Sequence, residues 1–117
     1  MQYDNLPIYK SALDFCVYIE TIVKGFGKYE KYTIGEDLRN YSKEILFLVH
    51  KANISLEKKD KLEHLRDKCE ELKMLIQLCK ELKAFQSFKQ FEVSSKMIVD
   101  IARQSQAWLN HYARVTK

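Results

Sequence analysis

Histidines are the first residues in this chain that could support metal chemistry, and there are three of them. The residues three positions before His50, His64 and His111 are Phe47, Lys61 and Trp108. A di-iron site in a helical bundle needs a Glu-x-x-His pair on each of two helices, and no such pair occurs. The Cys/His spacing of a zinc site is also missing. The sequence therefore predicts no metal site and no cofactor.

Carboxylates are the next candidates, because paired acids can act as a general acid and a general base. They form one group, Glu63, Asp67, Glu70 and Glu71, and the cations interleaved with it are Lys59, Arg66, Lys68 and Lys73. Opposite charges three or four residues apart on a helix form solvated ion pairs. No Gly-x-Ser-x-Gly, P-loop or GxGxxG motif is present. We therefore expect no catalytic residues and no enzymatic activity.

Three cysteines, Cys16, Cys69 and Cys79, form no CxxC motif, and all fall on apolar helical faces. A free cysteine in such a place behaves as a small hydrophobic residue, and its free state is typical of a reducing, cytoplasmic compartment. No apolar run exceeds five residues, and the N-terminus lacks the pattern of a signal peptide. We expect a cytoplasmic protein without a membrane span.

The elements that position these residues follow from the scarcity of helix breakers. The one proline and the three glycines stand at positions 7, 25, 27 and 35, so residues 36–117 contain neither. A sheet-containing domain needs such residues in its turns, so the composition favours an all-α fold. Apolar periodicity predicts helices at about 7–26, 34–53, 56–85 and 89–114. Short connectors between them indicate a single domain over 1–117, an up-down-up-down antiparallel four-helix bundle.

Local signals mark where these helices begin. Pro7 is suited to the first turn of the first helix. Residues 33–36, Thr-Ile-Gly-Glu, predict a capping box before the second helix. Leu46, Phe47 and Val49 widen the apolar stripe of that helix, which suggests burial on more than one side. Ser55 is the expected N-cap of the third helix.

The predicted helix over 56–85 combines an apolar seam with a basic edge. The seam, at heptad a and d positions, is Leu62, Leu65, Cys69, Leu72, Ile76 and Cys79. The edge, one cation every seven residues, is Lys59, Arg66, Lys73 and Lys80, with Lys83 beyond its end. The helix over 89–114 adds Lys96, Arg103 and Asn110 at the same spacing, a row that continues to Lys117, together with Arg114.

These rows flank one groove if the two helices pack as antiparallel neighbours. Residues 72–117 carry eight Lys/Arg and three Asp/Glu, a net charge of +5 within a chain of net +4. Lysine and arginine rows of this kind bind phosphates without reading bases. The alternative is a solvated face whose lysine methylenes shield the leucine seam.

A second surface feature is apolar. Met74, Leu75, Leu78 and Leu82 lie outside the seam, so the helix is apolar most of the way round from Leu72 onward. One interface within a bundle does not bury that much surface, which indicates a contact between subunits. The alternative is that the helix over 34–53 and the Phe85/Phe88/Phe91 cluster cover these side chains.

Three segments of the chain are similar to a known family. NLPIYKSALDF at 5–15, KYEKYTIGEDLRN at 28–40 and HKAN at 50–53 resemble the Avd family, the accessory proteins of diversity-generating retroelements. Relatives of that family include proteins encoded by intervening sequences of the large ribosomal RNA. The resemblance implies a homopentameric four-helix bundle that binds a reverse transcriptase and its template RNA or DNA. The alternative function is a protein-binding or scaffolding bundle without a nucleic-acid role.

Overall fold

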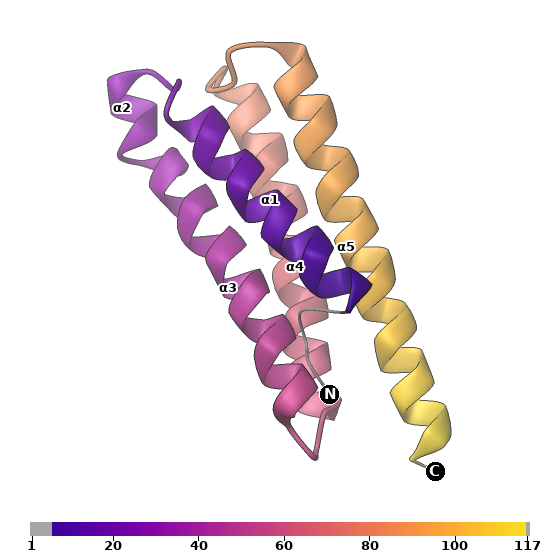
Figure 1. Cartoon of the computed structure of the whole chain (residues 1–117). Helices are drawn as coiled ribbons and strands as arrows, with labels where there is room; N and C mark the ends of the chain where they lie inside the picture. Colours follow the sequence, from indigo (N-terminus) through magenta and orange to yellow (C-terminus); the bar gives the residue numbers. More distant parts are fainter. Residues whose placement is uncertain (1–5, 117) are drawn as a thin grey trace.

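Five helices make up most of residues 6–116, which are the residues that the computed structural model describes (Figure 1). The helices are α1 (Pro7–Val23), α2 (Lys28–Lys31), α3 (Ile34–Ile54), α4 (Lys59–Glu81) and α5 (Phe88–Val115). Residues 6–116 contain no strand, which confirms the predicted all-α class. The connector predicted after the first helix contains the one-turn helix α2, which we did not predict from the sequence.

The four long helices are arranged in a ring of contacts. The neighbouring pairs are α1 with α3, α3 with α4, α4 with α5, and α5 with α1. The body measures 48 × 23 × 21 Å along its principal axes. The segment joining α1 to α3 and the segment joining α4 to α5 lie at one end, and the α3–α4 connector lies at the other (Figure 1). This is the arrangement of a helical bundle.

Burial follows the predicted periodicity most closely on α4. All six seam residues, Leu62 to Cys79, are at most 1% exposed. On α3 the stripe is narrower than predicted, because Val49 is buried but Phe47 is 56% exposed. Helix α3 has α1 and α4 as its main neighbours, so one side of it remains at the surface. The prediction that this helix is buried on more than one side is wrong for Phe47.

The start of α3 is at the predicted residue, but the predicted capping box is absent. The Thr33 hydroxyl donates to the carbonyl oxygen of Tyr29 at 2.8 Å, and the Glu36 carboxylate pairs with Arg39 at 3.5 Å. Thr33 has φ −116° and ψ −98°, which is not the extended conformation of an N-cap. Helix α2 ends at Lys31, two residues before Thr33, so the hydroxyl donates back to a carbonyl oxygen of that helix.

A methyl group at Gly35, in the first turn of α3, would clash with the backbone. A Cβ atom there would lie 2.8 Å from the carbonyl oxygen of Glu30 and 3.0 Å from Cγ1 of Val23. The short helix α2 therefore packs directly on α3 at this glycine. Helix α1 ends at Val23 rather than at the predicted residue 26, and Phe26 still lies buried in the core.

Ser55 does not cap the third long helix, which begins at Lys59 instead of the predicted residue 56. The Ser55 hydroxyl donates to the carbonyl oxygen of Lys51 at 2.6 Å, so it serves the end of α3. The residue is extended, with ψ 139°, and turns the chain away from α3. Four residues, rather than two, are then needed to reverse direction.

Lys58 organises the connector between α3 and α4. Its ammonium group donates to the carbonyl oxygens of Ala52, Asn53 and Ser55 at 2.7–2.9 Å. Its backbone N–H donates to the hydroxyl of Tyr112 at 3.2 Å. A cation bound to the last carbonyls of a helix also complements the negative end of the helix dipole. One residue thus ties the end of α3 to the start of α4 and to α5.

The end of α4 is at Glu81, four residues before the predicted end at 85. Lys83 has φ 60°, the left-handed region, where glycine is the usual residue. The N–H of Lys83 donates to Lys80 and that of Ala84 to Cys79, at 3.0 and 2.9 Å. These two bonds form a Schellman motif, and Ala84 is buried against the core. Packing of Ala84 therefore ends the helix without a glycine.

A variant of the capping box lies at the start of α5, where the reciprocal bond comes from the N–H of the residue before the N-cap, not from the N-cap residue Ser87 itself. The Ser87 hydroxyl accepts from the N–H of Gln90 at 3.3 Å, and the Gln90 side chain accepts from the N–H of Gln86 at 2.9 Å. The Ser-x-x-Gln pattern at 87–90 is the sequence signal for this box.

Lys83→Gly is expected to stabilise the fold by about 1 kcal/mol, because glycine adopts a positive φ without the steric cost of a Cβ atom. Lys83→Ala keeps that cost and serves as the matched control. Urea unfolding followed by circular dichroism measures both changes. A glycine variant no more stable than the alanine variant would contradict the Schellman assignment.

Candidate nucleic-acid and partner interface

A hollow of about 380 Å³ lies between α4 and α5, and it gathers three of the predicted basic residues. Its lining residues are Arg66, Glu70, Lys73, Val99, Ala102, Arg103 and Gln106. Arg66 and Lys73 are seven residues apart, two turns of α4, so both face the same neighbour. Arg103 reaches the hollow from α5. We call this feature the α4–α5 hollow.

Lys96 extends this surface along α5. It lines an adjoining hollow together with Ser95, Val99, Asp100 and Arg103, and two of these residues also line the α4–α5 hollow. Lys96 and Arg103 are again seven residues apart and share a face of the helix. Four of the seven predicted basic residues, Arg66, Lys73, Lys96 and Arg103, therefore lie along one continuous stretch of surface.

Carboxylates partly neutralise this stretch. The Arg66 guanidinium pairs with Asp67 at 3.2 Å, and the Lys73 ammonium pairs with Glu70 at 2.8 Å. Within residues 6–116, Lys96 and Arg103 take part in no ion pair. Exposed pairs contribute little to stability and exchange readily with other partners. A phosphate can thus compete for all four cations.

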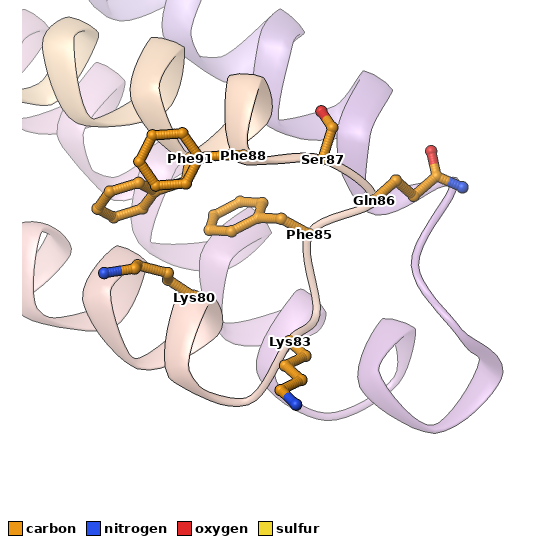
Figure 2. A pocket seen from close by; sticks show the side chains of 7 residues that line it. All are labelled: Lys80, Lys83, Phe85, Gln86, Ser87, Phe88 and Phe91. Atoms are coloured by element: carbon orange, nitrogen blue, oxygen red, sulfur yellow. The ribbon is translucent and has the colours of Figure 1, made fainter.

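Lys80 and Lys83 lie elsewhere, at a second hollow formed by the α4–α5 connector. Its lining residues are Lys80, Lys83, Phe85, Gln86, Ser87, Phe88 and Phe91 (Figure 2). The Lys80 ammonium is 5.0 Å from the centre of the Phe91 ring and 3.7 Å from the Glu81 carboxylate. The Lys83 side chain extends away from the three rings (Figure 2). We call this feature the connector hollow.

Arg114 and Lys117 do not join either group. Arg114 is exposed in the last turn of α5 and lines neither hollow. Lys117 lies outside the described residues. The seven-residue spacing on α5 therefore places only its first two cations, Lys96 and Arg103, beside α4.

Three of the four predicted interface residues form an exposed apolar stripe along the last turns of α4 and its C-cap residue, Leu82. Met74, Leu78 and Leu82 are 65%, 48% and 53% exposed, and they follow one another at four-residue spacing. We call them the α4 stripe. Leu75 differs, because it is partly buried and packs against the core of its own chain. Neither α3 nor the phenylalanine cluster covers the α4 stripe.

The thiols of the cysteines are not activated. Burial raises the pKa of Cys69 and of Cys79 to about 12, and it also raises the pKa of Cys16. The Cys16 thiol donates to the carbonyl oxygen of Ser42 at 3.1 Å. A thiol becomes a nucleophile by losing its proton, and these environments oppose that loss.

Neither a metal-binding cluster nor a membrane-spanning helix is present among residues 6–116. The described part of the chain contains no group of three or more His, Cys, Asp and Glu side chains placed to hold a metal ion. No helix in the same range is both long enough and apolar enough to span a membrane.

Comparison with known proteins gives no family. The sequence matches no protein-family model and no curated protein sequence. A proposal about function therefore depends on the α4–α5 hollow, the connector hollow and the α4 stripe.

The buried thiols predict a loss of stability at alkaline pH. Cys69 and Cys79 keep their protons in the folded state up to about pH 12, whereas unfolded thiols lose theirs above their ordinary value of 9.0. The folded state then binds more protons, so the free energy of unfolding falls as the pH rises, by about 1.4 kcal/mol per pH unit per thiol. Urea unfolding between pH 8 and 11 measures this slope. Cys79→Ala removes one of the two thiols, so it should reduce the slope by about 1.4 kcal/mol per pH unit. An unchanged slope would contradict the burial of that thiol.

Proposed function

We propose that this chain is a non-enzymatic, oligomeric accessory protein of the Avd family that acts in the cytoplasm. In this proposal an antiparallel up-down-up-down bundle binds the reverse transcriptase of a diversity-generating retroelement and its template RNA or DNA. The observation that carries the proposal is the convergence of Arg66, Lys73 and Arg103 on the α4–α5 hollow. The placement of the connectors at alternating ends supports the up-down order (Figure 1).

The charges around the α4–α5 hollow suit a phosphate backbone. With the adjoining hollow, its lining contains four cations and two carboxylates, Glu70 and Asp100. Asp100 accepts a hydrogen bond from Gln104 at 2.8 Å, so its charge is partly satisfied within α5. Phosphate contacts from lysine and arginine release counterions, and binding then weakens steeply with salt.

The α4 stripe supports the oligomeric part of the proposal. Met74, Leu78 and Leu82 expose large apolar side chains in a row on one helix. A monomer gains nothing from such a row, whereas a second copy would remove it from water. We propose a homopentamer in which the α4 stripe, with the edge of Leu75, forms the subunit contact.

A scaffolding protein without a nucleic-acid role is the second candidate. The ion pairs of Arg66 and Lys73 favour it, because they lower the charge available to a phosphate. The two candidates differ in what the α4–α5 hollow binds.

Lys73→Glu combined with Arg103→Glu is expected to abolish retention of a labelled RNA duplex at low salt. The reason is loss of two phosphate contacts and gain of two like charges. Filter binding measures retention, and light scattering checks that the oligomer is intact. Lys43→Glu with Lys51→Glu, two exposed positions on α3, gives the same change of charge and serves as the control. Unchanged retention in the first variant, or none in the wild type, would reject the nucleic-acid role.

Light scattering of the wild type is expected to give a mass of about 70 kDa, five times the 13.9 kDa of one chain. Met74→Lys with Leu78→Lys should yield monomers of unchanged helix content, because both side chains are exposed within one chain. A wild-type mass near that of one chain would contradict the oligomer.

A further inference from the structure

One end of the bundle holds an excess of positive charge equal to that of the whole chain. Two segments form this end, residues 24–33 and residues 80–91, and we call them together the basic end. They contain six lysines and two glutamates, a net charge of +4, which is also the formal net charge of the protein. The lysines are Lys24, Lys28, Lys31, Lys80, Lys83 and Lys89.

The two segments are far apart in the sequence but in contact in the structure. A Cβ atom on Gly25 would lie 2.6 Å from Oε1 of Gln86, so the two connectors touch. The rings of Phe26 and Phe85 meet edge to face, with 5.8 Å between their centres. In Figure 1 helix α2 and the α4–α5 connector occupy the same end, and Figure 2 shows Gln86 pointing toward the segment after α1. The basic end is therefore one surface.

Carboxylates leave most of this charge uncompensated. Of the six lysines, Lys80 alone forms an ion pair within residues 6–116, with Glu81 at 3.7 Å. This contrasts with the α4–α5 hollow, where Arg66 and Lys73 both have carboxylate partners. Lys83 also occupies a left-handed conformation that suits glycine better, with its ammonium directed outward.

Exposed aromatic rings accompany these lysines. Tyr29 is 75% exposed, Tyr32 65% and Phe88 61%. Tyr29 and Tyr32 belong to the α2 segment, and Phe88 borders the connector hollow. The Phe91 ring packs against the Phe88 ring at a tilt of 47°, with 5.5 Å between ring centres, while much of the Phe88 side chain faces water.

We propose that the basic end binds a single-stranded nucleic acid, with unpaired bases stacked on Phe88, Tyr29 and Tyr32 and phosphates held by the lysines. Proteins that bind single strands combine cations along the backbone with aromatic platforms for bases, and this surface offers both. The inference rests on the proposed nucleic-acid role, but it uses a surface separate from the α4–α5 hollow and specifies unpaired strands. A duplex fits less well, because its base faces are already stacked. An acidic protein would satisfy the lysines but leaves the exposed rings without a specific role.

The test is fluorescence anisotropy with labelled 12-nucleotide oligo-U and oligo-dT, and with a blunt duplex of the same length. Phe88→Leu with Tyr29→Leu keeps apolar bulk but removes two stacking surfaces, and should weaken single-strand binding about tenfold without changing its salt dependence. Lys28→Gln with Lys83→Gln should reduce the slope of log affinity against log salt by about 1.4, for two lost phosphate contacts.

The control for charge is Lys59→Gln with Lys61→Gln, at the start of α4 and at the other end of the bundle. It should have no effect on single-strand affinity. Circular dichroism checks the fold of each variant.

Three outcomes overturn the inference. One is wild-type affinity in the Phe88/Tyr29 variant, and another is equal or tighter binding of the duplex. The third is wild-type protein that binds no oligonucleotide but binds an acidic polypeptide such as poly-Glu. The first two leave the proposed function standing, because duplex retention by the Lys73/Arg103 variant tests it separately, whereas the third also rejects its nucleic-acid role. Loss of single-strand binding in the Lys73/Arg103 variant, with wild-type affinity in the Phe88/Tyr29 variant, would keep the proposed function and remove the basic end as a site.

Discussion

Burial of one apolar seam on each long helix is the interaction on which the rest of this structure depends. Helix α4 shows it most clearly, since its six seam residues are almost fully removed from water between α3 and α5. Helical periodicity then fixes where every other side chain of α4 points. Arg66 and Lys73 turn toward the edge shared with α5, and the α4 stripe turns outward. The candidate surfaces are thus consequences of how the seam packs.

The helix ends are made without glycine or proline after residue 35, and this shapes the ends of the bundle. At one end Lys58 binds three carbonyl oxygens of α3 and its N–H reaches Tyr112. At the other, Lys83 takes a left-handed conformation while Ala84 packs into the core. At these two connectors, side-chain contacts stabilise turns for which glycine, with its wider range of backbone conformations, is the more usual residue. In the basic end this holds for the α4–α5 connector, where the buried Ala84 takes the place of a glycine turn.

Charge is distributed differently on the sides and at the basic end. Along the sides, several cations have carboxylate partners one helical turn away, as with Lys73 and Glu70 or Lys68 and Glu71, although Lys96 and Arg103 have none among the described residues. At the basic end the lysines outnumber the glutamates three to one, and the exposed rings stand among them. The two surfaces suit different ligands in our proposals: a phosphate backbone in the α4–α5 hollow, and a strand with free bases at the basic end.

The sequence by itself determined the helical class, the seam of α4 and the heptad rows of cations, because these depend on periodicity within one helix. It also contained the true capping signal at Ser87 and Gln90. Only the tertiary structure decided which cations meet: Arg66, Lys73 and Arg103 converge, whereas Lys80 and Lys83 lie with three phenylalanines. It likewise ended α4 at Glu81, replaced the expected role of Thr33 and exposed Phe47 and Phe88. The meeting of the cations and the shape of the two ends depend on contacts between residues distant in the chain, such as Gly25 with Gln86 and Lys58 with Tyr112, which no local pattern encodes.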